Sequence, residues 1–152
     1  MFKVKTRKKR IAVRLLIGFL ILYCTYIGAV WLRAANSHIF IDQPSDIGKY
    51  EARKVEVMEL KDKVMILKML DKRFFTTHRG EGIAQCPKGE IKLVVMKRNG
   101  SFTEFYPVTD SCDSIFYDDR QNFFMTSSED RDNLEALWVQ NGFPTEFHVN
   151  NY

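Results

Sequence analysis

The sequence is poor in the residues that most often carry chemistry, with only three cysteines and three histidines among 152 residues. It has no Cys-x-x-Cys pair, and His38, His78 and His148 stand singly, without a second His or Cys at the spacing of metal ligands. The G-x-S-x-G, S-x-x-K, H-E-x-x-H and P-loop motifs are also absent. We therefore predict a protein that is not an enzyme and that binds no metal or other cofactor.

Acidic residues are the remaining candidates for catalysis in this sequence. Asp110, Asp113, Asp118 and Asp119 lie close together in the sequence, but they lack the D-x-D-x-D-G spacing of a calcium-binding loop. Turns, helix caps and solvated surface explain these residues more simply than catalysis does. A hydrolase that uses two of them as paired carboxylates is the alternative that this part of the sequence leaves open.

Charge is missing from residues 15–32, which form one long apolar run. A bilayer hydrocarbon core of about 30 Å requires roughly 20 residues of helix, and this run with its flanks is long enough. Its apolar residues would cover every face of a helix, and Tyr23, Tyr26 and Trp31 add rings that suit a membrane interface. We predict a single transmembrane helix over residues 15–33. A removable export signal and a buried soluble helix are the alternatives.

Acidic residues are also absent ahead of this run, whereas seven Lys and Arg residues precede it. After Arg33 no further cation occurs until Lys49. The positive-inside rule then predicts that residues 1–14 form a basic cytoplasmic arm and that the rest lies outside the cytoplasm, in a bacterium in the periplasm. An export signal would have a shorter apolar run of about 7 to 15 residues, followed by a small-x-small cleavage site. The residues at the end of this run, Leu32-Arg33-Ala34, do not have that pattern.

The positive net charge of +4 comes from the N-terminal arm. From residue 34 onward there are 15 Lys and Arg against 19 Asp and Glu, so the sequence gives no support to nucleic-acid binding. Within this part, residues 49–98 are basic and residues 99–152 are acidic. Anionic lipid headgroups are the expected partners of the basic arm, which adds to the membrane contact of the helix.

The small number of cysteines fits an oxidising compartment. Cys24 falls in the apolar run, so Cys86 and Cys112 are the only two cysteines beyond it. Two cysteines outside the cytoplasm most simply pair, and we predict a Cys86–Cys112 disulfide that stabilises the folded domain by about 3–4 kcal/mol. Free structural thiols and a reactive thiol are the alternatives.

The remainder predicts a small α+β domain at residues 47–152, with an antiparallel sheet and one or two packed helices. Residues 34–46 are expected to form a juxtamembrane connector with a short strand at 38–41. Residues 47–74 have apolar residues at helical spacing and are interpreted as a helix, with a hairpin as the alternative. These apolar residues are Tyr50, Val57, Leu60, Val64, Leu67 and Phe74.

The clearest local signal is a β-hairpin at about 90–97 and 101–108, because strand-forming residues flank Asn99-Gly100, which suits a type I′ turn. Short strands are expected near 114–117 and 122–126, and a last strand at 145–149. Between them, a helix is expected to begin after Ser127 or Ser128 and to end before Gly142, and its buried residues are predicted to be Leu134, Leu137 and Trp138.

The layout of a short basic arm, one membrane helix and a small exported domain indicates an accessory protein. The cytoplasmic arm is too short to hold an output domain, so any signal has to pass through a partner. We expect the protein to bind another membrane or exported protein as an assembly factor, chaperone or co-regulator. The alternative is a membrane-tethered immunity or inhibitor protein whose acidic half, residues 99–152, attracts a basic toxin.

Overall fold

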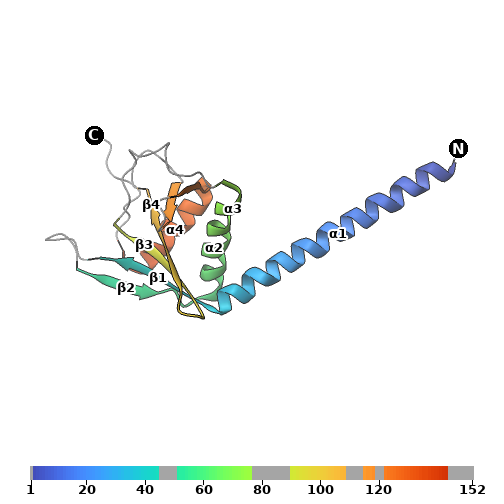
Figure 1. Ribbon diagram of the computed structural model, residues 1–152. Helices are drawn as coiled ribbons and strands as arrows, with labels where there is room; N and C mark the ends of the chain where they lie inside the picture. The colour runs from blue at the N-terminus through green and yellow to red at the C-terminus, as the bar shows by residue number, and fades with distance from the viewer. Residues whose placement is uncertain (1, 45–50, 77–89, 109–114, 119–121, 144–152) are drawn as a thin grey trace, which may run out of the picture.

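The computed structural model describes residues 2–44, 51–76, 90–108, 115–118 and 122–143. One long N-terminal helix projects from a small domain that holds all the strands (Figure 1). The helices are α1 (Phe2–Ala35), α2 (Leu60–Asp71), α3 (Arg73–Thr76) and α4 (Ser128–Gln140). The strands are β1 (Ser37–Gln43), β2 (Arg53–Glu56), β3 (Lys92–Lys97), β4 (Phe102–Pro107), β5 (Ile115–Asp118) and β6 (Phe123–Met125).

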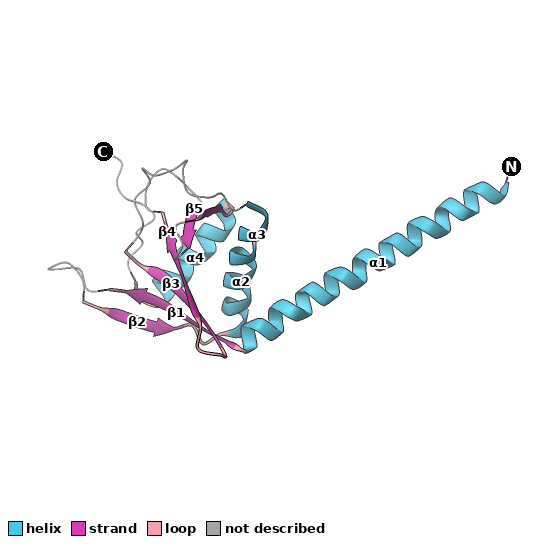
Figure 2. Ribbon diagram, in the orientation of Figure 1, coloured by secondary structure: helices cyan, strands magenta, loops and turns pink. Residues whose placement is uncertain are grey.

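The strands form one six-stranded antiparallel sheet in the order β2-β1-β3-β4-β5-β6. Ile41 of β1 lies opposite Val55 of β2 on one side and Leu93 of β3 on the other, so β1 is an internal strand. Figure 2 shows the strands with α2 and α4 beside them. This architecture confirms the predicted α+β class, with a long apolar N-terminal helix and a few helices packed on an antiparallel sheet.

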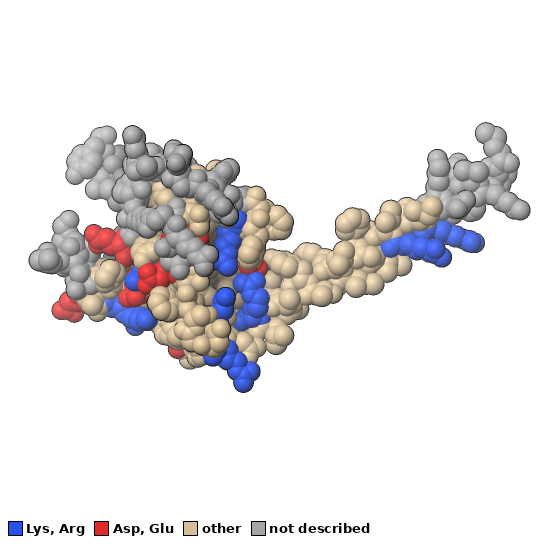
Figure 3. Space-filling view, viewed as in Figure 1, with Lys and Arg blue, Asp and Glu red and all other residues tan. Residues whose placement is uncertain are grey.

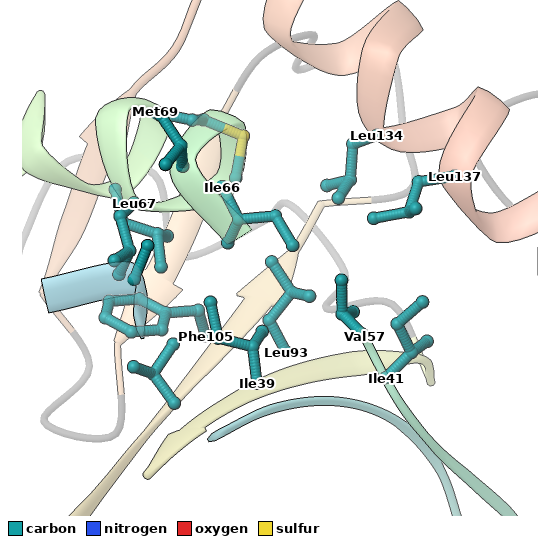
Figure 4. Packing of buried hydrophobic residues seen from close by; sticks show 14 of the residues in the cluster. Ile39, Ile41, Val57, Ile66, Leu67, Met69, Leu93, Phe105, Leu134 and Leu137 are labelled. Carbon is teal, nitrogen blue, oxygen red and sulfur yellow. The ribbon is translucent and has the colours of Figure 1, made fainter. Parts of the chain in front are cut away.

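The hydrophobic core lies between one face of the sheet and helices α2 and α4. Every second residue of β1 points inward, so Ile39 and Ile41 are completely buried. Ile66 of α2 and Leu134 of α4 approach them from the other side (Figure 4). The helices thus cover the face of the sheet on which the apolar side chains of its central strands gather.

The expected hairpin is confirmed as β3 and β4, but its loop differs from the prediction. Gly100 donates a backbone hydrogen bond to the carbonyl of Lys97, and Lys97 in turn donates one to Ser101, which leaves three residues in the loop. Gly100 has a φ of +81°, so the connection has the form of a type I turn followed by a glycine bulge rather than a two-residue type I′ turn.

The single helix expected at 47–74 is wrong for the first part of the segment. Residues 53–56 form β2 at the edge of the sheet, and the amide of Val57 donates a hydrogen bond to the carbonyl of Ile39. Pairing with β1 therefore overrides the local preference for helix, and α2 begins only at Leu60. Val57, Val64 and Leu67 of the predicted apolar stripe are buried, whereas Leu60 and Phe74 are exposed.

The connector expected at 34–46 contains more structure than predicted, because β1 occupies residues 37–43 and pairs on both sides. The strands expected near 114–117 and 122–126 are found as β5 and β6. The strand expected at 145–149 lies outside the described residues.

The C-terminal helix α4 begins and ends as predicted. Ser127 is its N-cap, and the Ser127 side chain and backbone form a capping box with Asp130. Gly142 follows the helix with a φ of +73°, a conformation that glycine adopts without a steric penalty. The side chains of Leu134, Leu137 and Trp138 are buried as expected.

Candidate functional site

The junction between α1 and the domain is formed by the last turn of α1. Val30 is 1% exposed and Ala34 is completely buried, whereas Leu16 and Phe19 in the middle of the helix are each 70% exposed. Only Asn36 separates α1 from β1, and its amide still bonds to the carbonyl of Leu32. The apolar helix therefore joins the sheet without a flexible linker.

An ion pair holds this junction. One guanidinium nitrogen of Arg33 donates to both carboxylate oxygens of Asp71, at 2.9 and 2.8 Å. Asp71 is buried and is the last residue of α2, where the helix dipole disfavours a negative charge. Arg33 supplies the opposite charge that makes this placement tolerable, so the end of α1 and the end of α2 stabilise each other.

A groove opens beside the ion pair, between α1 and the α2–α3 segment, which diverge from a common corner (Figure 1). Its volume is about 580 Å³. Phe74 and Phe75 of α3 are 68% and 90% exposed and form part of its wall. The other lining residues are Tyr23, Tyr26, Ile27, Arg33, Lys68, Asp71 and Lys72.

The groove combines an apolar interior with a basic rim. Figure 3 shows Lys and Arg side chains gathered in a band on the domain beside the base of α1. Of the lining residues, Arg33, Lys68 and Lys72 are cations and Asp71 is an acid. Lys72 forms an ion pair with Asp130, and the Arg73 guanidinium lies 4.9 Å from the ring centre of Phe74. This arrangement suits a ligand with an apolar part and a negative charge.

A second polar cluster lies on the face of the sheet opposite the helices. Lys92 bonds to Glu104 at 2.7 Å and lies 3.7 Å from Asp42, and Tyr106 donates to Glu104. The hydrogen bonds from Lys92 and Tyr106 lower the pKa of Glu104. Partial burial opposes protonation of Lys92, but its contacts with Glu104, Tyr106 and Asp42 raise its pKa overall.

The pKa of Glu104 is thus shifted further below 7 and the pKa of Lys92 further above 7, so Glu104 stays ionised and Lys92 stays protonated at pH 7. A general acid or base works best with a pKa near the operating pH. The cluster therefore resembles a structural ion-pair network that connects β1, β3 and β4 more than it resembles a catalytic site.

Several residues singled out in the sequence fall outside the described part of the chain. Cys86 and Cys112 are among them, so their predicted disulfide stays a prediction, while Cys24 is a free, exposed thiol on α1. His38 pairs with Glu56 at 2.7 Å, whereas His78 and His148 are not described. In the described residues, no three His, Cys, Asp or Glu side chains gather as metal ligands would.

The four Asp residues considered for catalysis are not brought together by anything that the structure describes. Asp118 accepts hydrogen bonds from the backbone and side chain of Asn122, which connect the end of β5 to the residue before β6. Asp110, Asp113 and Asp119 lie outside the described residues.

The groove itself was missed by sequence reasoning. Helical spacing predicts that Phe74 is buried, although the adjacent residues Lys72, Arg73 and Phe75 form a basic-aromatic cluster of a kind that is common in segments at an interface. Comparisons with protein-family models, curated proteins and solved structures find no match, so no relative informs the role of this site.

Proposed function

We propose that the protein is a membrane-anchored, extracytoplasmic accessory protein without catalytic activity, which binds and stabilises or regulates another membrane or exported protein. Helix α1 would span the bilayer with residues 1–14 in the cytoplasm. The observation that carries the proposal is the exposure of α1: the segment Lys9–Ala35 is long and apolar enough to cross a membrane, yet only 6% of its apolar window is buried. Such a surface needs an apolar solvent.

The direct connection of α1 to β1 supports a role in recognition. A domain held by a flexible linker samples many orientations, and ordering it on a partner costs conformational entropy. Here Arg33 of the anchor pairs with Asp71 of α2, and only Asn36 separates the anchor from β1, so the domain keeps one orientation relative to α1. This favours binding of a partner that lies in, or close to, the same membrane.

Topology is tested by fusing alkaline phosphatase after Tyr152 and, separately, before residue 1. We expect activity only for the C-terminal fusion, because this enzyme needs an oxidising compartment for its disulfides. A cytosolic C-terminal fusion, or an intact chain in the soluble fraction, would contradict the proposed anchor.

Partner binding is tested by photocrosslinking from exposed positions of the domain in intact membranes, with Met58 and Val139 as attachment sites. We expect one membrane or exported protein to crosslink reproducibly and to lose stability or activity when the gene for this chain is deleted. A crosslinked secreted toxin that the protein neutralises would support the immunity alternative instead. A partnerless monomer with hydrolytic activity would overturn the proposed class.

A further inference from the structure

The position of the groove along α1 places it at the depth of a bilayer leaflet. Arg14 and Arg33 are 19 residues apart, and at about 1.5 Å per residue they are separated by roughly 29 Å, close to the thickness of a hydrocarbon core. Tyr23 and Ile27 lie 10 and 6 residues before Arg33, about 15 and 9 Å toward the bilayer centre. This step rests on the proposed insertion of α1.

Helix α3 lies across the groove from this part of α1, at a similar depth. Phe74 and Phe75 line the groove together with Tyr23 and Ile27, although α3 belongs to the domain. With α1 inserted, two phenylalanines that are largely exposed to water would meet the outer leaflet. The cation of Lys68 on the same wall would then extend toward the phosphates of the headgroups.

We propose that the groove and α3 form a second membrane contact that binds anionic phospholipid of the outer leaflet. The Phe74 and Phe75 rings insert among the acyl chains of the outer leaflet, and an acyl chain occupies the groove against Tyr23 and Ile27. The lipid phosphate lies at the basic rim, near Lys68. The domain is thereby held against the bilayer at two points, its anchor and α3.

Two observations favour lipid as the occupant over a partner protein. The groove is continuous with the exposed apolar surface of α1, which lipid covers whenever the helix is inserted. Its lining has three cations, Arg33, Lys68 and Lys72, against the one carboxylate of Asp71. Arg33 pairs with Asp71 and Lys72 pairs with Asp130, so the exposed Lys68 is the cation that complements a phosphate group. Aromatic rings and cations at one level are typical of interfacial contact with a membrane.

The test uses the full chain reconstituted in vesicles of phosphatidylcholine and phosphatidylglycerol, with bromine atoms on the acyl chains as short-range quenchers. In a full-length chain whose native Trp31 and Trp138 are replaced by Phe, Phe75→Trp places a single reporter on α3, and Val139→Trp, at an exposed apolar position of α4, is the matched control. We expect bromolipid to quench the Phe75→Trp reporter while acrylamide in the water phase quenches it little. The Val139→Trp reporter is expected to show the reverse.

A separate chain with Trp138→Phe keeps the native Trp31 as its one tryptophan. Trp31 lies on α1, so its quenching reports insertion of the anchor independently of the lipid contact at α3. If bromolipid quenches Trp31 but not the Phe75→Trp reporter, the anchor stands and the lipid contact is wrong. That result would mean that lipid alone does not fill the groove. A helix of a partner protein would then be the expected occupant. If Trp31 is not quenched either, the proposed insertion itself fails.

The charge on the rim is tested with Lys68→Glu, whose control is Lys54→Glu on the edge strand β2; both lysines are exposed. Introducing Lys68→Glu should lower bromolipid quenching of the Phe75→Trp reporter about twofold, because the cation near the headgroups is lost. Replacing phosphatidylglycerol by phosphatidylcholine should have a similar effect, because Lys68 then has no anionic headgroup to pair with. Lys54→Glu should leave the quenching unchanged. Equal quenching with and without anionic lipid would overturn the assignment of the phosphate to this rim.

Discussion

Arg33 and Asp71 are 38 positions apart in the sequence, and one guanidinium nitrogen of Arg33 donates to both carboxylate oxygens of Asp71. This ion pair joins the last turn of α1 to the last residue of α2. Asp71 is buried while Arg33 remains partly exposed. The pair therefore neutralises a carboxylate that would otherwise be unpaired in the domain, and it fixes the direction in which α1 leaves the domain.

Asp71→Asn should lower the free energy of unfolding of the domain by about 1–2 kcal/mol, because charge-assisted hydrogen bonds to the carboxylate are lost. Denaturant unfolding of the detergent-solubilised chain, followed by fluorescence of the buried Trp138 in a Trp31→Phe background, measures this change. Asp132→Asn makes the same chemical change at an exposed position of α4, and we expect it to stay within about 0.5 kcal/mol of the parent. Equal effects of the two variants would show that the ion pair adds nothing.

Ala34→Leu should destabilise the junction by about 1–3 kcal/mol, because Ala34 is completely buried and a larger side chain has no space there. Its neighbour Ala35 is exposed, so Ala35→Leu is the matched control and should have almost no effect. Unfolding and limited proteolysis near Asn36 both report the change. A neutral Ala34→Leu variant would mean that α1 does not dock on the domain as described.

Acid should remove the stabilisation that Glu104 provides. Hydrogen bonds from Lys92 and Tyr106 lower the pKa of Glu104 in the folded state, so its contribution is complete above the ordinary pKa of about 4.3 and is lost as the pH falls through the lower folded value. Glu104→Gln should therefore cost about 1 kcal/mol at pH 7 and progressively less as the solution is acidified below pH 4. Glu51→Gln, at an exposed position, should show neither effect. A pH-independent cost would contradict the linkage.

Reduction of the chain should lower the stability of the domain by about 3–4 kcal/mol if Cys86 and Cys112 are paired, since the bridge closes a loop of 27 residues. Peptide mapping without reductant should identify a Cys86–Cys112 crosslinked peptide. Cys24→Ser is the control variant and should leave both the map and the stability unchanged. Recovery of both thiols unmodified from the extracytoplasmic fraction would exclude the bridge.

Local sequence signals predicted the elements whose structure is determined locally. The capping box of Ser127 and Asp130 and the glycine at position 142 defined α4, and strand formers around Asn99-Gly100 located the β3–β4 hairpin. The exact loop could not be predicted, because a two-residue and a three-residue turn both accommodate a glycine at Gly100.

Long-range pairing explains the part that sequence reasoning did not predict. Residues 53–56 have helix-forming neighbours, but Val55 and Val57 alternate with charged residues, which leaves a hairpin as the alternative. The pairing of Val55 with Ile41 decides in favour of a strand. The groove depends on the angle at which α1 leaves the domain, which no local pattern encodes. Phe74 is therefore predicted from the sequence as a core residue, although the fold leaves it exposed.

The single residue between α1 and β1 has a mechanical consequence for a chain anchored by α1. Helices in bilayers respond to changes in hydrocarbon thickness by tilting. With Asn36 as the whole connection, a change in the tilt or rotation of α1 would reorient the entire sheet by a similar angle. Bilayer thickness and lateral packing around the anchor would then determine which surface of the domain faces its neighbours.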